Sequence, residues 1–133
     1  MGKELGYQLK NSERFKSIDI ILPVPLHKLK KRRRGFNQCD FIAEGVSEAM
    51  GCEWSVKHLK RVLFNVSQTG KNTYNRHGNT KRIFESRREE YLQNKQVLIV
   101  DDVITTGATM ESCARQLEHI KGIKLYLASI AYA

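Results

Sequence analysis

A short apolar segment that runs directly into two acids and a small-residue segment constrains the fold more than any other part of the chain. Residues 97–109 read VLIVDDVITTGAT. The first four are apolar and mostly β-branched, which is typical of a central parallel strand covered on both faces. We expect Asp101 and Asp102 to stand where this strand ends, before an amphipathic helix at about 108–121. This order predicts a ligand site at the carboxyl end of a strand in an α/β fold.

The residues between the acidic pair and the helix suit a phosphate. The first turn of a helix carries unpaired backbone N–H groups and the positive end of the peptide dipole, so main-chain atoms alone can hold an anion. Gly107 can adopt a positive φ, and small side chains let the anion approach the backbone closely. The residues expected around this phosphate are Val103, Thr105, Thr106, Gly107, Ala108 and Thr109.

Asp101 and Asp102 suit a sugar better than a phosphate. Ionised carboxylates only accept hydrogen bonds, so an adjacent pair can bind a vicinal diol but would repel a phosphate. We therefore expect a ribose at the acidic pair and its 5′-phosphate in the following loop. Acidic pairs and Thr-Thr-Gly turns also occur without a ligand, but the complete order of strand, acids, loop and helix favours a site. A Walker P-loop is excluded because its Gly-Lys-Ser/Thr ending is missing.

Strand and helix signals alternate along the rest of the chain, which predicts a right-handed, doubly wound, mostly parallel sheet in a Rossmann-like three-layer α/β fold. With 133 residues, 41% of them hydrophobic, the chain is expected to form a single domain over 1–133. The polar segment 65–81 has no sustained period, so we expect either a functional lid or disorder there. The other expected elements are helices near 3–15 and 37–50 and strands near 19–24, 55–63, 83–84 and 124–131.

These motifs resemble those of the type I phosphoribosyltransferases. Their phosphoribosyl-pyrophosphate (PRPP) motif is four apolar residues, two acids, two apolar residues and Thr/Ser-Thr-Gly-x-Thr, and residues 97–109 match it completely. Within this superfamily the chain resembles the ComF family, named after a DNA-uptake competence protein. ComF relatives usually carry an N-terminal zinc ribbon with paired CxxC motifs, so we expect a form without that module. The other matching segments are DIILPVPL at 19–26, RGFNQ at 34–38, Leu-x-Arg at 59–61, Gln68, and Arg76 with Asn79.

The resemblance implies a phosphoribosyltransferase, an enzyme that transfers ribose-5-phosphate from PRPP to an amine or base and releases pyrophosphate in the presence of Mg²⁺. Asp101 and Asp102 would offset the oxocarbenium-like charge of the ribose. Mg²⁺ would be bound mainly through the substrate, so we expect no metal site in the protein alone. The sequence leaves the acceptor open. The residues that the resemblance assigns to pyrophosphate are Val24, Pro25, Leu26 and Arg34, and those in the flexible loop are Gln68 and Arg76.

The chain carries a net charge of +9, and its densest basic block is HKLKKRRR at 27–34. We expect Arg34 to contact pyrophosphate and residues 28–33 to lie exposed, where they steer anions toward the site. Two other functions stay open. One is a non-catalytic module that senses PRPP or a nucleotide. The other is a DNA-binding protein linked to DNA uptake, with the basic segment 28–34 on the phosphates.

Further expectations concern thiols, histidines and location. The three cysteines have no metal-ligand spacing, so we expect reduced thiols in a cytoplasmic protein. The four histidines, His58 among them, are expected at the surface or in loops. The chain lacks an apolar segment of membrane-spanning length and a signal peptide, so we expect no membrane partner. A homo-oligomer is also expected.

Overall fold

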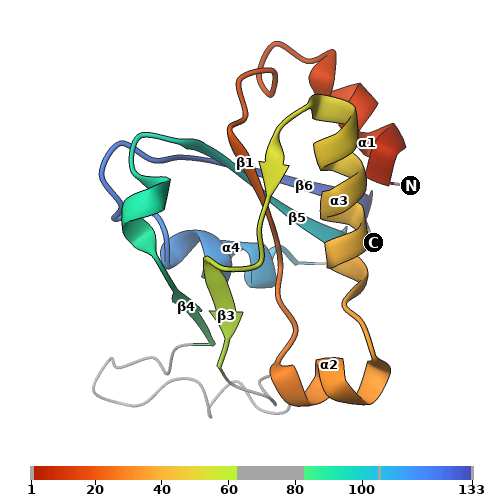
Figure 1. The fold of residues 1–133 in the computed structure, drawn as a ribbon, viewed down its shortest axis with the longest axis vertical. Coiled ribbons are helices and arrows are strands. Elements are labelled where there is room, and N and C mark those ends of the chain that lie inside the picture. The colour runs from red at the N-terminus through yellow and green to blue at the C-terminus, as the bar shows by residue number, and fades with distance from the viewer. Residues whose placement is uncertain (1, 63–82, 105, 133) are drawn as a thin grey trace.

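A computed structural model of the chain describes residues 2–62, 83–104 and 106–132. Thr105, Gln68 and Arg76 therefore lie outside the described residues. Four strands form a parallel main sheet in the order β2-β1-β5-β6, and two form a small antiparallel sheet (Figure 1). The main sheet contains β1 (Ile20–Pro23), β2 (Glu53–Trp54), β5 (Gln96–Ile104) and β6 (Lys124–Tyr132), and the small one β3 (Leu59–Arg61) and β4 (Phe84–Ser86).

The order of the main strands reverses between β1 and β5. The helix α3 (Gln38–Met50) leads from β1 to β2 on one side, and α4 (Ala108–Arg115) leads from β5 to β6 on the other. In open parallel sheets, ligands bind beyond the carboxyl ends of the strands at this kind of reversal. The doubly wound α/β fold expected from the sequence is confirmed, and it directs attention to the ends of β1 and β5.

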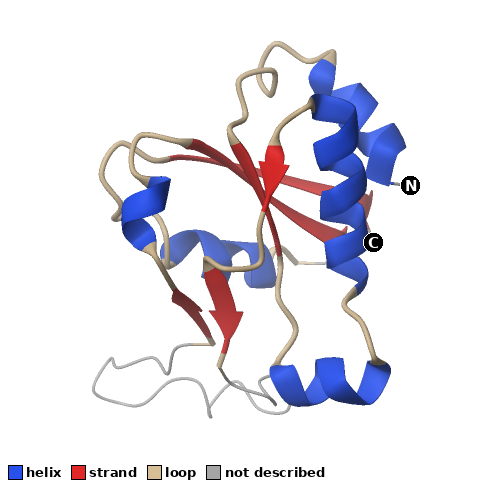
Figure 2. Cartoon of the chain, in the orientation of Figure 1, coloured by secondary structure: helices blue, strands red, loops and turns tan. Residues whose placement is uncertain are grey.

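Helices cover both faces of the main sheet. Figure 2 shows α1 (Gly2–Lys10) and α3 together on one side of the strands and α4 on the other. Side chains of β5 alternate accordingly: Leu98 and Val100 pack with α1 and α3, whereas Val97 and Ile99 pack with α4 and the small sheet. All four are 0% exposed, which is the double burial that their apolar run predicts.

Facing glycines bring α1 and α3 close together. A Cβ added to Gly45 would lie 2.7 Å from the backbone nitrogen of Lys3 and 2.9 Å from the Cα of Gly2. A Cβ on Gly6 would lie 2.6 Å from the Cβ of Ala49. The missing side chains let the two backbones approach, and this contact fixes the position of α3.

Two predicted helices are shorter than expected. The first ends at Lys10 rather than near residue 15, and α4 ends at Arg115 rather than near 121. Beyond α4 the backbone tightens into turns, in which the N–H of Ile120 donates to the carbonyl of Leu117. Such three-residue bonds replace the last α-helical turns. None of the described helices is long and apolar enough to cross a membrane.

The strand predictions need two corrections. The strand expected at 55–63 is wrong, because the chain forms β2 and β3 in different sheets with a bend between them. The strand at 97–100 continues to Ile104, because pairing with β6 extends as far as the Ile104–Tyr132 pair. The acidic pair therefore lies inside β5, not beyond its end.

Of the two places expected for His58, the surface or a loop, it takes the loop: it lies in the bend between β2 and β3 and is buried. His58 is only 3% exposed, and its ring stacks on that of Tyr91 at a centroid distance of 5.4 Å. Its Nδ1 lies 3.2 Å from the carbonyl oxygen of Arg87. This histidine supports the small sheet. The three cysteines are free thiols, as expected.

Candidate functional site

Asp101 and Asp102 lie near the carboxyl end of β5, next to the end of β1. The N–H of Val24 donates to the carbonyl of Val100 at 2.9 Å, which joins the chain after β1 to the residue before the pair. Each carboxylate accepts a hydrogen bond from the next amide, at 2.8 Å for Asp101 and 2.7 Å for Asp102. Asp101 is half-buried and Asp102 is exposed. Both carboxylates are thus held against the strand at the edge of the sheet.

Asp101 has a further partner in Cys39, which lies in the first turn of α3. The thiol donates to Oδ1 of Asp101 over an Sγ–Oδ1 distance of 3.2 Å. Burial raises the pKa of the Cys39 thiol, and the nearby Asp101 charge raises it further, so the thiol stays protonated and acts as a donor. Burial also raises the pKa of Asp101, whereas the Cys39 hydrogen bond favours its ionised form. The cysteine was missed as a site residue because its partner lies 62 positions away.

The loop after β5 turns directly into α4. Gly107 is the N-cap residue of this helix and has a φ of 84°, the positive value expected for it. The hydroxyl of Thr106 accepts a hydrogen bond from the N–H of Ala108 at 3.2 Å. A hollow of about 30 Å³ lies at this turn. Five of the six residues predicted for the phosphate and one acid line it together. The lining consists of Asp101, Val103, Ile104, Thr106, Gly107, Ala108, Thr109 and Met110.

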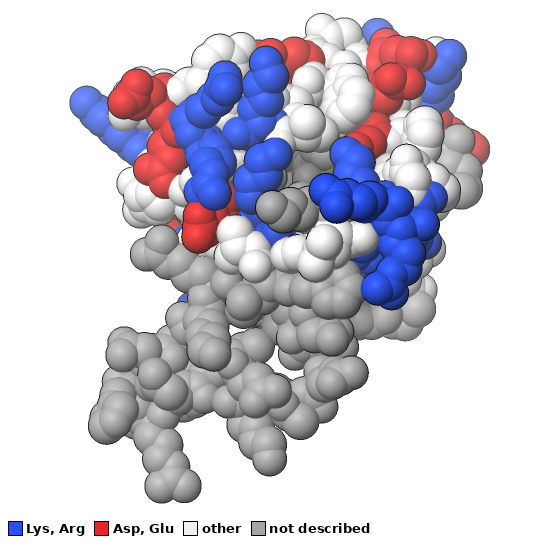
Figure 3. All heavy atoms as spheres, turned by 60° about the horizontal axis from the view of Figure 1, so that its bottom comes forward, with Lys and Arg blue, Asp and Glu red and all other residues white. Residues whose placement is uncertain are grey.

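A larger cavity, of about 460 Å³, lies at the end of β1. Among its described lining residues, Asp40 is the one carboxylate, against four lysines and arginines. Such a surplus of positive charge in a concave site suits a multiply charged anion. The lining includes two of the predicted pyrophosphate residues, Pro25 and Leu26, together with the cations Lys31, Lys60, Arg61 and Arg87. Lysine and arginine side chains gather on this end of the molecule (Figure 3).

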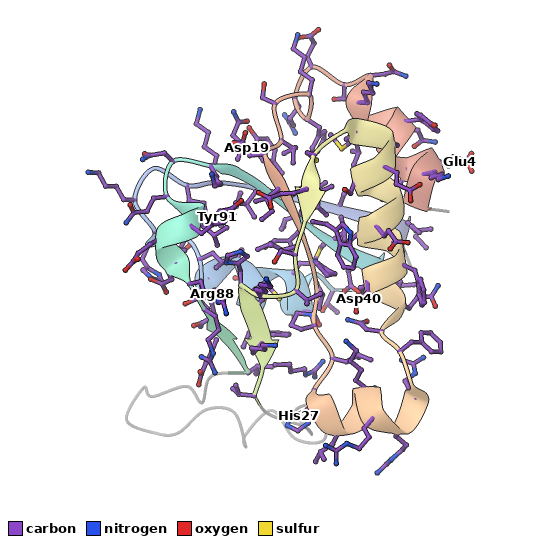
Figure 4. All side chains as sticks on the ribbon, in the orientation of Figure 1. Glu4, Asp19, His27, Asp40, Arg88 and Tyr91 are labelled. Carbon is purple, nitrogen blue, oxygen red and sulfur yellow. The ribbon has the colours of Figure 1, made fainter. Side chains whose placement is uncertain are left out.

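The basic block forms the short helix α2 (Lys28–Arg34), which the sequence did not predict. His27 caps it, because Nδ1 accepts a hydrogen bond from the N–H of Leu29 at 3.1 Å. Lys31 lines the large cavity and forms an ion pair with Asp40 at 3.4 Å. Figure 4 shows Asp40 on the turn of α3 nearest α2, and His27 at the start of α2.

The other two residues expected at pyrophosphate, Arg34 and Val24, do not line the large cavity. The Cζ of Arg34 lies 5.9 Å from the centroid of the Phe36 ring. Val24 is buried at the end of β1 and contacts Val100 through its backbone. Among the described residues of α2, Lys31 is a cation that lines this cavity, and the pyrophosphate contact expected for Arg34 stays a prediction.

Arg61, the arginine of the Leu-x-Arg motif, lies at the large cavity. It lines the cavity from β3, and its Cζ lies 5.5 Å from the centroid of the Phe84 ring. Burial lowers the pKa of its guanidinium, while Cys113 and Asp101 act in the opposite direction. The sequence indicated Arg61 as part of the Leu-x-Arg motif at 59–61, but the motif alone did not predict a function for it.

Comparison with known proteins agrees with this geometry. A family model described as phosphoribosyl transferase domain matches residues 41–132. DNA utilization protein YhgH of Escherichia coli O157:H7 is 35% identical over 99 residues, which cover 74% of this chain and 43% of that protein. Competence protein F of Haemophilus influenzae is 32% identical over 114 residues, covering 84% of this chain and 49% of that protein. The chain thus spans less than half the length of these curated relatives.

Solved structures show the same fold. A purine phosphoribosyltransferase from Pyrococcus horikoshii Ot3 superposes with a TM-score of 0.62 at 19% identity, over 98% of this chain and 70% of that chain. An adenine phosphoribosyltransferase from Trypanosoma brucei, in complex with AMP, pyrophosphate and ribose-5-phosphate, gives 0.61 at 16% identity, over 98% and 51%. With the family match and the competence-named relatives, these findings show that the chain belongs to the phosphoribosyltransferase family, as a ComF-like member of type I.

Proposed function

We propose that this chain binds PRPP across the carboxyl ends of β1 and β5 and transfers its ribose-5-phosphate group to an amine or base. The observation that carries the proposal is the adjacency of three different subsites at the strand reversal: a capped helix start, an acidic pair and a basic cavity. PRPP carries the three matching groups, a terminal phosphate, a vicinal diol and a pyrophosphate. No single one of the subsites would be specific for it.

Each subsite has its own part in the proposed reaction. Amides at the start of α4, after Gly107, would hold the 5′-phosphate, and Asp101 and Asp102 would accept hydrogen bonds from the ribose hydroxyls. As the bond from the anomeric carbon to the pyrophosphate oxygen breaks, the ribose gains positive charge, which the two carboxylates offset. The departing pyrophosphate keeps the electron pair, and the cations Lys31 and Arg61 would stabilise it. The nucleophile forms the new bond to the anomeric carbon and releases its proton.

The acidic pair also fits Mg²⁺, which the fold family generally uses with PRPP. Mg²⁺ is a hard cation that prefers oxygen ligands, so Asp102 and Asp101 are suitable and the protonated thiol of Cys39 is not. When bound, Mg²⁺ would neutralise pyrophosphate oxygens. Two carboxylates fill only part of an octahedral shell, so PRPP and water would supply the remaining ligands.

Calorimetric titration with PRPP and Mg²⁺ tests this proposal. Asp102→Asn should weaken PRPP binding about tenfold or more, because a hydrogen bond to a charged group contributes roughly 1.5–3 kcal/mol. Glu48→Gln is the matched control, since it also neutralises an exposed acid, but near the end of α3, where Glu48 pairs with Lys3. Failure of the wild type to bind PRPP at millimolar concentration would overturn the proposal.

A second assay separates catalysis from binding alone. Pyrophosphate release is measured with ammonia, other amines and nucleobases as acceptors. Release that depends on one acceptor supports the transferase. PRPP binding without release for any acceptor favours the alternative, a non-catalytic module that senses PRPP.

DNA binding is a second candidate function, favoured by the exposed basic residues 30–34 of α2 and by the competence names of relatives. The protein would then contact the phosphates of DNA through its basic segment 28–34 rather than through the acidic pair. Its binding should weaken steeply with rising salt and survive Asp101→Asn. Binding that Asp101→Asn abolishes would count against a separate DNA surface.

A further inference from the structure

On the basis of the proposed function, we infer that Asn37 and Cys39 are positioning residues. Together they fix the position of the pyrophosphate side of the site relative to the ribose side. Both lie at the start of α3, between the end of β1 and the acidic pair of β5. Asn37 contacts the chain on the pyrophosphate side, and Cys39 contacts Asp101 on the ribose side.

Asn37 ties the chain after β1 to α3. Its side chain is only 4% exposed, and its Nδ2 donates to the carbonyl of Val24 at 3.0 Å. Its Oδ1 accepts a hydrogen bond from the N–H of Cys39 at 3.1 Å. The same asparagine therefore anchors the proline-rich segment that lines the large cavity and caps the helix that carries the thiol.

The second amide hydrogen of Asn37 extends the network to a cavity cation. Nδ2 also lies 3.3 Å from Oδ1 of Asp40, whose Oδ2 pairs with Lys31 at 3.4 Å. A carboxamide supplies two donor hydrogens and an acceptor oxygen, and the three contacts of Asn37 use all of these. Aspartate would lose both donors, and serine would keep only one.

Cys39 carries the network to the ribose side. Its protonated thiol donates to Asp101, as described above, and its backbone N–H is the group that Asn37 holds. A displacement of Asn37 would therefore move both the Cys39 thiol, which donates to Asp101, and the carbonyl of Val24. Loss of the Cys39 thiol alone would remove a hydrogen bond from the Asp101 carboxylate and leave the pyrophosphate side unchanged. A general effect on folding would weaken both sides equally, so the two cases can be told apart.

The test uses two probes, ribose 5-phosphate and inorganic pyrophosphate, each titrated with Mg²⁺ into the full chain. Cys39→Ala should weaken ribose 5-phosphate binding about tenfold and leave pyrophosphate within about twofold, and Cys39→Ser should restore the first value because serine keeps a donor. Asn37→Ser, which still suits a helix N-cap, should weaken both probes by about fivefold or more. Cys52→Ala is the control, because Cys52 lies beyond the far end of α3 and its removal should change neither affinity.

Each result decides. If the wild type binds neither probe, the proposed function fails and this inference with it. If the wild type binds both probes and Cys39→Ala matches it for ribose 5-phosphate, the inference alone is overturned. Equal weakening of both probes in Cys39→Ala would indicate a merely structural thiol and would also overturn it. Should Cys39→Ala not fold, Cys39→Val fills the same space without a donor and gives the same comparison.

Discussion

Replacing Gly45 by alanine should destabilise the protein, although alanine is the better helix former. Within α3, glycine costs about 1 kcal/mol relative to alanine, so propensity alone predicts a gain. The added Cβ would lie 2.7 Å from the nitrogen of Lys3 and 2.9 Å from the Cα of Gly2, which are backbone atoms and cannot rotate away. Overpacking of this kind costs up to about 3 kcal/mol, which leaves a net loss of roughly 2 kcal/mol.

Urea unfolding followed by circular dichroism measures this loss. For a domain of this size, a loss of about 2 kcal/mol also lowers Tm by roughly 6–10 °C. Glu44→Gly in comparison with Glu44→Ala is the control, because Glu44 is exposed on the same helix and reports propensity alone. A Gly45→Ala protein more stable than the wild type would refute the reasoning, since it would mean that α1 can shift away from α3 without loss of stability.

Three further outcomes are expected. Under native conditions a maleimide should modify the half-exposed Cys52 well before Cys113, because Cys113 is buried and burial raises its pKa to about 12; mass spectrometry gives the order, and equal rates would contradict it. Hydrogen bonds from the Ser86 hydroxyl and from His119 lower the pKa of Glu89, so the stability that ionised Glu89 contributes is present at neutral pH and is lost as pH falls through that lowered pKa; below it the difference in Tm between wild type and Glu89→Gln should vanish, and a difference that persists there would exclude this. Lys31→Gln should weaken pyrophosphate binding more at low salt than at high salt, and a salt-independent loss would argue against an electrostatic role.

Local sequence signals predicted the parts of the structure that local chemistry decides. The apolar run before Asp101 is buried on both faces as expected. The helix expected near 37–50 is present as α3, with Asn37 as its N-cap residue and Gly51 in the left-handed conformation at its end. Gly107 likewise has the positive φ that the loop requires. Each of these depends on a few neighbouring residues, so a pattern in the sequence is sufficient.

The parts that the sequence did not predict depend on distant partners. β5 continues through the acidic pair because Asp101 pairs with Ser129, which no local pattern indicates. The contact between Cys39 and Asp101 joins the first turn of one helix to a strand far along the chain. The sequence indicates Arg61 only as part of the Leu-x-Arg motif, because its place beside the cavity depends on the small sheet. Tertiary pairing therefore decided these features over local propensity.

The extended pairing of β5 with β6 makes the end of the chain a neighbour of the phosphate loop. Tyr132 pairs with Ile104, so the last described residue pair of β5 and β6 lies next to the hollow at Gly107. An affinity tag or a fused protein attached behind Tyr132 would crowd incoming ligands. Removal of residues 131–132 would take away the β6 partners of Val103 and Ile104, two of the residues that line that hollow. The shape of the loop after β5 thus depends on the last residues of β6.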